Sequence, residues 1–479
     1  MVSTFLSFYS IKSPIYMVYM LQQVEYNPRK FLDWVGRLYK QHKKLGTVIQ
    51  RQKLVATSKA TVLIVFLYTV VVSVVVSGLV LADGELIFVL AKLLLLLLSL
   101  PIWLILALAT ASFAAHSLII KPSERKLLAT SREIFSSNEA IKIAVIGSYG
   151  KTTMKELLLK ILEQGKCVTA TPGNMNTTVS HAGFAKRLTG KEEVIIVEFG
   201  EGKPGDVERM SDMLRPDYAV VTGLAPNHLD HYLTLEAVAN DLLSVKEYLG
   251  KESIFTNCES ALLKSYSKTG VTAFNKTLVL GWKISDVKVS ISGTSFKMKN
   301  GKKTLSVKSG ILGEHQVAPL AFAAAFAAKL GLTKSQIEAG CLSIKPYEHR
   351  MQPRKIYGAW LIDDTYNGNL EGLLAGLSLL EGLVADRKWY VTPGLVDQGV
   401  ETDRVHRKLG KKIAESNIDI VVLMDNSVRT IIEDSMTKFG FKGELRVEEN
   451  PLEFYLNIEH IVAAGDVVLM QNDWTDNYN

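Results

Sequence analysis

A short glycine-rich turn is the part of the chain whose residue types and spacing best suit phosphate chemistry. It reads Gly147, Ser148, Tyr149, Gly150, Lys151, Thr152 and Thr153. Glycines let backbone N–H groups close around phosphate oxygens, and a helix that follows adds its partial positive charge. Lys151 can reach the terminal phosphates, and the hydroxyl of Thr152 is placed to ligate Mg²⁺. The commonest phosphate loop would need glycine where this chain has Val145, so the shorter spacing depends on its context.

The segments on either side supply that context. Residues 141–146 are rich in β-branched side chains and predict a buried parallel strand. The segment after the turn predicts a helix, with one apolar face made of Met154, Leu157, Leu158, Ile161 and Leu162. A strand before and a helix after favour a phosphate-binding loop. The alternative is an ordinary strand-to-helix turn that happens to contain a lysine.

Polar residues also follow two other predicted strands. Glu198 ends the apolar run that begins at Val194, and the run from Tyr218 to Thr222 leads to His228. The carboxyl ends of parallel strands meet at one crevice, so we expect both side chains near the glycine turn. A carboxylate there can hold Mg²⁺, and a histidine suits a second metal or proton transfer. From position alone, Glu198 could equally be a solvated residue at a strand end, whereas the place of His228 at the same edge favours a functional role over a packed or surface one.

Three further clusters are less specific. The loop from Thr171 to Thr177 has small polar groups that can hydrogen-bond a polar ligand. Arg350 could pair with a phosphate in bidentate fashion, and Asp364 follows a predicted strand and could bind a ribose hydroxyl or Mg²⁺. Without further context these clusters would be ordinary surface features.

Strand-like and helical patterns alternate after residue 140, which predicts parallel sheets covered by helices. The strands of a central domain, 141–344, are expected at Ile141–Ile146, Val194–Glu198, Tyr218–Thr222 and Ser253–Thr256. Those of a C-terminal domain, 345–479, are expected at Trp360–Asp363, Trp389–Thr392, Ile418–Leu423 and Val467–Met470. Between the two sets, Val287–Val307 predicts a small antiparallel patch. The fold class is therefore α/β: a phosphate-loop-type central ATPase domain and a smaller Rossmann-like C-terminal domain.

The first 140 residues predict a membrane-associated region. Residues 1–58 are predicted to be a basic and aromatic membrane-proximal segment. Within it, Arg29–Lys59 favours an amphipathic helix on an anionic leaflet, with a solvated charged face as the alternative. Residues 59–121 contain two apolar runs, each longer than the roughly 20 residues that cross a bilayer. Basic residues flank the outer ends and an acidic turn, 83–85, joins the runs, so we expect a transmembrane hairpin with both ends in the cytoplasm. Residues 122–140 are predicted to be a linker.

Composition narrows the possible partners. The chain has 479 residues and a net charge of +7. Much of the excess positive charge lies beside the apolar runs, so a membrane surface explains it better than nucleic acid does. Cys167, Cys258 and Cys341 have neither metal-ligand spacing nor a disulfide pattern, which fits a reducing compartment.

Taken in order, these motifs resemble the Mur ligase family. The resemblance covers about Ile141 to the C-terminus. It is carried by Gly147–Thr153, Thr171–Asn176, Val197–Glu198, Asn227–Asp230, Gly313–His315, His349–Arg350 and Asp363–Asn369. The resemblance implies ATP- and Mg²⁺-dependent formation of an amide bond through an acyl phosphate. It also implies a muramoyl-peptide precursor of peptidoglycan, free or lipid-linked, as one substrate, with D-alanyl-D-alanine favoured as the amine.

The resemblance also implies a role for each matching residue. Residues that would bind ATP are Gly147, Ser148, Gly150, Lys151, Thr152, Thr153, Arg350, Asp364, Tyr366 and Asn367. Residues that would hold metal are Thr152, Glu198, His228 and, as a carbamate, Lys246. Residues that would act in catalysis are Lys151, His228, Lys246 and Arg350. Residues that would contact the substrate are Thr171, Asn174 and Asn176.

The chain departs from the family pattern in several places, which include the residues after Asn176, the run Asn367–Leu370 and the spacing from His228 to Lys246. The UDP-sugar-binding N-terminal domain of the family is replaced by the basic and apolar segments, and two family asparagines are replaced by Gln316 and Pro319. We therefore expect a ligase tethered to the cytoplasmic face of the inner membrane. The alternatives are a Mur-like ligase for another carboxylate and amine, or a non-catalytic nucleotide-binding scaffold. The scaffold is disfavoured by the joint presence of Lys151, Glu198, His228, Arg350 and Asp364.

Overall fold

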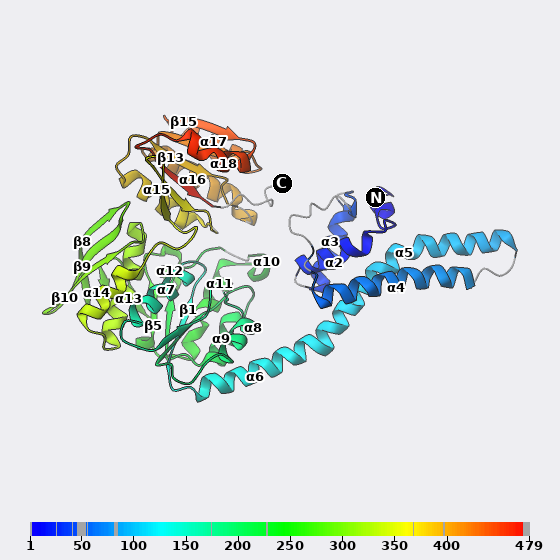
Figure 1. The fold of residues 1–479 in the computed structure, drawn as a ribbon, viewed down its shortest axis with the longest axis horizontal. Coiled ribbons are helices and arrows are strands. Elements are labelled where there is room, and N and C mark those ends of the chain that lie inside the picture. The colour runs from blue at the N-terminus through cyan, green and yellow to red at the C-terminus, as the bar shows by residue number, and fades with distance from the viewer. Residues whose placement is uncertain are drawn as a thin grey trace. The chain divides into compact units, whose positions relative to one another are not determined.

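The chain folds into two compact units, Met1–Leu127 and Leu128–Asn479, each described by itself (Figure 1). The computed structural model describes residues 2–24, 26–40, 42–45, 54, 56–80, 85–173, 175–226, 229–366, 368–395 and 398–472. The side chains of residues 119, 120, 230 and 400 are not described.

The described part of the first unit is helical. Its helices are α1 (Val2–Ser7), α2 (Ser13–Gln23), α3 (Pro28–Lys40), α4 (Ser58–Val80) and α5 (Leu86–Ala115). The long helices α4 and α5 pack against each other, and α2 and α3 pack against the end of this hairpin where α4 begins. Leu67 of α4 and Leu104 and Leu108 of α5 are buried there with Met17 and Phe31.

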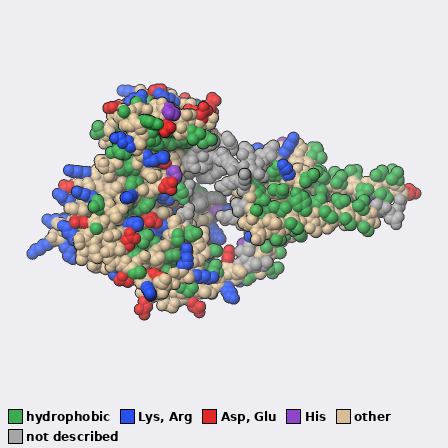
Figure 2. Space-filling model, viewed as in Figure 1, with side chains coloured by type: hydrophobic (Ala, Val, Ile, Leu, Met, Phe, Trp, Pro, Cys, Tyr) green, Lys and Arg blue, Asp and Glu red, His purple; other side chains and the backbone are tan. Residues whose placement is uncertain are grey.

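The far part of the hairpin leaves large apolar side chains on its surface (Figure 2). Val75 and Leu79 of α4 are exposed, as are Ile87 and Phe88 of α5. Both helices are long and apolar enough to cross a membrane, although a buried helix of a soluble protein can satisfy the same test. Here most of each apolar stretch is exposed, which is costly in water and favourable in lipid.

The segment predicted as a linker is mostly helical. A π-helical turn, η2 (His116–Ile120), joins α5 to α6 (Lys121–Ser137). Only residues after 137 lack regular structure before the first strand begins at Ile141. Phe135 at the end of α6 is buried in the core of the second unit, so this helix ends as part of that unit.

The central domain contains a six-stranded parallel sheet in the order β2-β3-β1-β4-β5-β6. Its strands are β1 (Ile141–Ile146), β2 (Val168–Ala170), β3 (Val194–Glu198), β4 (Tyr218–Val221), β5 (Ile254–Asn257) and β6 (Thr272–Phe274). The longer helices around it are α7 (Lys151–Leu162), α8 (Thr178–Ala185), α9 (Asp206–Leu214), α11 (Leu235–Leu242), α13 (Val317–Lys329) and α14 (Lys334–Ser343). Shorter helices are α10 (Leu229–Tyr232), η3 (Ser244–Glu247), η4 (Lys251–Ser253), α12 (Ala261–Tyr266) and η5 (Glu314–Gln316).

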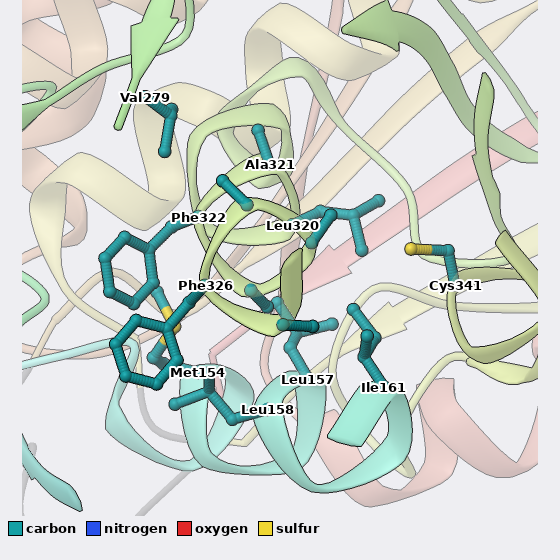
Figure 3. Packing of buried hydrophobic residues seen from close by; sticks show 14 of the residues in the cluster. Met154, Leu157, Leu158, Ile161, Val279, Leu320, Ala321, Phe322, Phe326 and Cys341 are labelled. Carbon is teal, nitrogen blue, oxygen red and sulfur yellow. The ribbon is translucent and has the colours of Figure 1, made fainter. Parts of the chain in front are cut away.

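Alternation along β1 builds a core on each face of this sheet. Ile143 and Val145 pack with α7 and α13, whereas Ala144 and Ile146 pack with the layer that contains α9 and α11. On the first face, Leu157 and Leu158 of α7 meet Phe322 of α13 in one continuous cluster (Figure 3). This packing fixes the helix that begins directly after the glycine turn.

A small antiparallel sheet follows in the order β10-β9-β8-β7. Its strands are β7 (Leu278–Val279), β8 (Trp282–Ser290), β9 (Gly293–Asn300) and β10 (Lys303–Ser309). The patch predicted from Val287 to Val307 is confirmed, and it begins earlier in the chain than expected.

The C-terminal domain contains a second six-stranded sheet, in the order β11-β12-β16-β13-β14-β15. Its strands are β11 (Gln352–Ile356), β12 (Ala359–Asp364), β13 (Lys388–Thr392), β14 (Ile420–Met424), β15 (Glu444–Glu448) and β16 (Val467–Gln471). Its helices are α15 (Leu370–Gly382), η6 (Gly399–Glu401), α16 (Thr402–Glu415), α17 (Arg429–Lys438) and α18 (Pro451–Ile461). The edge strand β11 is antiparallel to β12, and the other neighbours run parallel.

The predicted α/β class and parallel central sheet are confirmed. The sequence did not predict the edge strands of the two six-stranded sheets, β2, β6, β11 and β15. Each of these strands is short or carries charged residues. Because β11 precedes β12, Asp364 ends the second strand of its sheet, not the first as predicted.

Truncating Phe322 to alanine should destabilise the central domain. The ring is 1% exposed and stacks on Phe274 with centroids 4.6 Å apart, so Phe322→Ala should cost about 3–5 kcal/mol. Thermal unfolding of the full chain in detergent would measure the loss. Tyr266→Ala, at a 37% exposed ring of the same domain, is the matched control and should change stability little. Equal effects of the two variants would contradict this account of the core.

Candidate functional site

The glycine turn is built by close backbone contacts at the carboxyl end of β1. Gly147 has φ 145° and Gly150 has φ 74°, which are values that glycine tolerates best. A Cβ at Gly147 would lie 2.3 Å from Thr222 Oγ1, so a larger residue would collide with the loop after β4. The N–H of Ser148 donates to the carbonyl of Gly223 at 2.9 Å, and the Thr222 hydroxyl donates to the carbonyl of Ile146 at 3.2 Å. The turn is thus tied to the neighbouring strand.

Helix α7 begins directly at Lys151, with Gly150 as its N-cap. No side chain caps this terminus. The first N–H groups of a helix lack partners within the helix, and they carry part of its positive dipole charge. The turn and the helix start therefore form an environment suited to phosphate oxygens.

The amine of Lys151 is held over the turn by two acceptors. Its Nζ donates to the carbonyl of Gly147 and forms an ion pair with Glu201 Oε2 at 2.7 Å. The side chains of Lys151 and Glu201 are 11% and 3% exposed, so the pair is largely shielded from water. Glu201 was not predicted, because it lies in the loop after β3 and no local pattern sets it apart from other charged loop residues.

A second charged group lies beside the first turn of α7. Glu198 Oε1 accepts from the hydroxyl of Thr152 at 3.1 Å and from Asn176 Nδ2 at 3.4 Å, and Glu198 Oε2 lies 3.4 Å from Lys155 Nζ. The structure thus brings together three of the predicted residues. Lys155 was not predicted as a site residue. Its position one helical turn after Lys151 was the signal in the sequence that could have indicated it.

These groups fit a magnesium ion held together with a nucleotide. Carboxylate and hydroxyl oxygens are the ligands that Mg²⁺ prefers, and it commonly binds through one or two protein groups plus phosphates and water. Glu198 Oε2 is buried and accepts no hydrogen bond from the described residues. The described residues contain no group of three or more His, Cys, Asp or Glu side chains arranged to hold a metal alone. Thr152 and Glu198 would therefore supply the protein part of the site.

The loop predicted to contact substrate is partly structural. Thr171 is buried, and its hydroxyl accepts from the backbone N–H of Glu198 at 3.1 Å, so it fastens this loop to β3 and is not directed at a ligand. Asn176 accepts through its carbonyl from the N–H of Gly200 at 2.7 Å and reaches Glu198 through its side chain. Asn174 lies outside the described residues.

A buried histidine supports the end of β3. His181 Nε2 lies 2.8 Å from the carbonyl of Glu198, and burial lowers its pKa to about 4. The ring is therefore neutral at ordinary pH and positions the backbone that carries Glu198. The predicted metal ligand His228 lies outside the described residues, so its place relative to Glu198 is not described.

Lys246 is not brought to this site. A Cβ at Gly270 would lie 3.8 Å from Lys246 Cε, and Gly270 lies two residues before the first residue of strand β6. The glycine turn follows the carboxyl end of β1 in the same parallel sheet. Lys246 thus lies at the opposite edge, and the structure does not support its predicted role as a metal ligand. The cause is that α11 ends before Lys246 and the chain has already turned toward the start of β5.

An unpredicted carboxylate from α11 is buried beside the loop that follows β3. Asp241 accepts from the N–H of Gly205 at 2.8 Å and from the Tyr232 hydroxyl at 2.7 Å. Burial is the main cause that raises the pKa of Asp241, and the charge of Asp206 adds to it. The hydrogen bonds that Asp241 accepts act in the opposite direction. The charges of Asp241, Asp206 and Glu201 all act on Tyr232, so these acidic groups lie near that hydroxyl.

The C-terminal domain contributes a second set of polar residues. The Arg350 guanidinium lies 4.4 Å from the ring centroid of Tyr366. Asp364 accepts from the N–H of Met351 at 3.1 Å and from Gln471 Nε2 at 2.8 Å. Burial raises the pKa of Asp364 to about 6, against these hydrogen bonds and the charge of Arg350.

The two domains of the second unit meet at the turn itself. The hydroxyl of Tyr149 donates to Glu371 at the start of α15. A Cβ at Gly223 would lie 2.3 Å from the Tyr149 ring, so the ring is packed closely against the loop after β4. Asn367, the remaining predicted nucleotide contact, lies outside the described residues.

Comparison with known proteins agrees with this geometry. Residues 145–327 match the Mur ligase middle domain. The UDP-N-acetylmuramoyl-tripeptide–D-alanyl-D-alanine ligase of Haemophilus influenzae is 25% identical over 333 residues, covering 67% of this chain and 72% of that enzyme. The enzyme of the same name from Bacillus subtilis is 27% identical over 340 residues, covering 69% of this chain and 72% of its own length.

Solved structures show the same fold. The crystal structure of MurF ligase from Thermotoga maritima in complex with ADP superposes with a TM-score of 0.64 at 23% identity, covering 73% of this chain and 80% of that one. A MurF structure from Acinetobacter baumannii gives a TM-score of 0.63 at 18% identity, covering 73% and 77%. Through the middle-domain match, the fold and the glycine turn with its lysine and carboxylates, this chain is similar to the Mur ligase family, and these features mark it as an ATP-dependent acid–amino-acid ligase of that type.

Proposed function

We propose that this chain joins an amine, with D-alanyl-D-alanine favoured, to a muramoyl-peptide precursor of peptidoglycan at the cytoplasmic face of the inner membrane. The observation that carries the proposal is the convergence of Lys151, Thr152 and Glu198 at one sheet edge. The named substrates of the two curated relatives motivate the choice of amine and carboxylate.

ATP with Mg²⁺ supplies the activation: the substrate carboxylate takes the γ-phosphoryl group, ADP leaves, and the incoming amine then displaces phosphate. Lys151 and the N–H groups of the glycine turn hold the phosphates, and negative charge that develops there is met by fixed positive charge. Thr152 and Glu198 would hold the metal. Lys155 balances the buried charge of Glu198 and so keeps that carboxylate in place.

Arg350, Asp364 and Tyr366 are proposed to complete the nucleotide site from the C-terminal domain. A guanidinium suits a phosphate, and the carboxylate of Asp364 suits a ribose hydroxyl. The contact from Tyr149 to Glu371 supports the idea that the glycine turn and this domain act on one ligand. His228 remains a proposed second metal ligand.

The hairpin of α4 and α5 is proposed to tether the enzyme to the membrane. The exposed apolar side chains and the basic residues at the outer ends support this placement. Tethering would raise the local concentration of membrane-bound precursors, so a lipid-linked muramoyl peptide is the alternative carboxylate. Incubating the enzyme with ATP, free or lipid-linked muramoyl peptides and candidate amines, and weighing the products by mass spectrometry, tests the assignment. ADP release without any peptide product would contradict these substrates.

Removing the amine of Lys151 should strongly reduce ATP turnover. Lys151→Ala takes away the positive charge nearest the glycine turn, and we expect kcat to fall by about 10²–10³-fold. A coupled assay of ADP release measures it. Lys160→Ala, a 43% exposed lysine on the same helix, is the control and should retain turnover. Normal turnover by Lys151→Ala would show that the phosphate loop is misassigned.

Neutralising Glu198 should weaken the response to magnesium. Glu198→Gln keeps the shape but removes the charge that would face Mg²⁺, so half-maximal activity should need roughly tenfold more Mg²⁺. A magnesium titration at saturating ATP measures the shift. Glu193→Gln, at an exposed glutamate before the same strand, is the control. An unchanged magnesium requirement would argue against Glu198 as a ligand.

Asp364 should make ATP binding depend on pH. Its pKa of about 6 lies above the ordinary value of 3.8, so the carboxylate is protonated in acid and accepts hydrogen bonds less well. The KM for ATP should therefore fall as the pH rises from 5 to 7.5. Asp364→Asn cannot titrate and should flatten this part of the profile. Parallel profiles of the two enzymes would contradict a role for Asp364 at the nucleotide.

A further inference from the structure

The small antiparallel sheet of the second unit has one buried face and one exposed face. Phe296 and Met298 of β9 and Val307 of β10 are buried in the core that also contains α13. Because side chains alternate along a strand, Lys297 and Lys299 lie on the opposite face, where they are exposed. Lys and Arg side chains gather at the outer edge of this sheet (Figure 2).

The exposed face carries charge of one sign. Pairing between β8, β9 and β10 sets three rows of side chains across it. One row contains Lys283, Lys299 and Thr304, the second contains Ser285, Lys297 and Ser306, and the third contains Lys288, Ser295 and Lys308. The rows are made of lysines and small hydroxyl residues, and none of these side chains is acidic or aromatic. Lys302 in the turn after β9 and Lys303 at the start of β10 are also exposed and extend the charge. We call this set of rows the lysine face.

Such a pattern costs the sheet stability unless something else makes use of it. Lys283 and Lys299 are directly opposite each other, and like charges in a cross-strand pair are destabilising. Asp286 forms an ion pair with Lys297 at 3.0 Å, but both side chains are exposed, so the pair contributes little and can exchange for another anion. Glu338 beside β10 already accepts from the N–H of Ser306 at 2.6 Å. The lysine face thus keeps an excess of positive charge.

The chemistry of the lysine face suits a broad layer of negative charge better than one shaped ligand. Its cations are ammonium groups, whereas bidentate recognition of phosphates and base edges uses guanidinium groups. Single-stranded nucleic acid is bound by stacking on aromatic rings, and the three rows contain none. A leaflet rich in anionic headgroups presents a broad negative surface and attracts clusters of lysines.

We propose that the lysine face docks on the anionic cytoplasmic leaflet and holds the ligase domains at the membrane surface. The inference rests on the proposed insertion of α4 and α5, because a hairpin in the same chain keeps the face beside the leaflet and raises the effective concentration of a weak contact. Each ammonium group gains little from the leaflet by itself, but the contributions of several lysines add.

Lysine acylation, read by mass spectrometry on the full chain in nanodiscs, tests the docking. The nanodiscs contain either phosphatidylcholine alone or an equal mixture with phosphatidylglycerol. Labelling of Lys283, Lys297 and Lys299 should fall about threefold to tenfold in the anionic nanodiscs, because docking covers their ammonium groups. The exposed Lys160 and Lys411, on α7 and α16, should label equally in both. Molar salt should restore labelling of the lysine face, because it screens the attraction.

Neutralising two lysines of the face should release it from the leaflet. Lys297→Gln/Lys299→Gln should weaken docking roughly tenfold to thirtyfold, so that Lys283 in the anionic nanodiscs labels as it does in phosphatidylcholine. Lys160→Gln/Lys411→Gln removes the same charge elsewhere and is the matched control, so it should keep the protection. Thermal unfolding in detergent verifies that both variants fold, since substitutions at exposed lysines should change stability little.

Three results would overturn the docking while the chain stays in the nanodiscs, which leaves the tether in place. They are equal labelling of the lysine face in both lipids, equal loss of protection in the control variant, and protection by added RNA in phosphatidylcholine but not by phosphatidylglycerol. The last result would assign the face to nucleic acid. A chain that enters neither nanodisc would contradict the tether and, with it, the docking.

Discussion

The arrangement of the site depends on one buried charge, the carboxylate of Glu198 at the end of β3. Glu198 is 1% exposed, and moving a carboxylate out of water is costly unless opposite charge and hydrogen bonds compensate. Lys155, which is fully buried, faces one oxygen, while Thr152 and Asn176 donate to the other. Since Lys155 and Thr152 both belong to α7, this compensation also fixes the first turn of that helix against β3. The amino-terminal end of α7 and the carboxylate of Glu198 are therefore positioned by the same interaction.

Register in the parallel sheet makes that interaction possible. Val145 of β1 pairs with Glu198 of β3, and Ile146 pairs with Val221 of β4, so the three strands end level with one another. The glycine turn, the carboxylate and Thr222 then emerge at one edge from distant parts of the sequence. Beneath them, α7 and α13 fill one face of the sheet with close-packed apolar side chains, which leaves the helix little freedom to move away.

The two units make opposite use of apolar residues. In the second unit, the large aliphatic and aromatic side chains of the sheets are buried between helices. In the first unit, many side chains of α4 and α5 face outward, and burial is concentrated where α2 and α3 cover the base of the hairpin. An exposed apolar surface suited to lipid thus arises from this partial coverage.

Local patterns in the sequence were sufficient to predict the α/β class, the glycine turn, the central strands and the helical hairpin. Strand and helix periods, glycine spacing and long uncharged runs are local signals, and each is strong where the element is long or fully buried. Short edge strands such as β2 and β6 lack such a signal because neighbours across the sheet stabilise them. Tertiary structure alone decided the roles of Glu201, Lys155 and Asp241, and it placed Lys246 at the far edge of the sheet. Electrostatic compensation of buried charge acts between residues that are distant in sequence, so only the folded chain shows which charges meet.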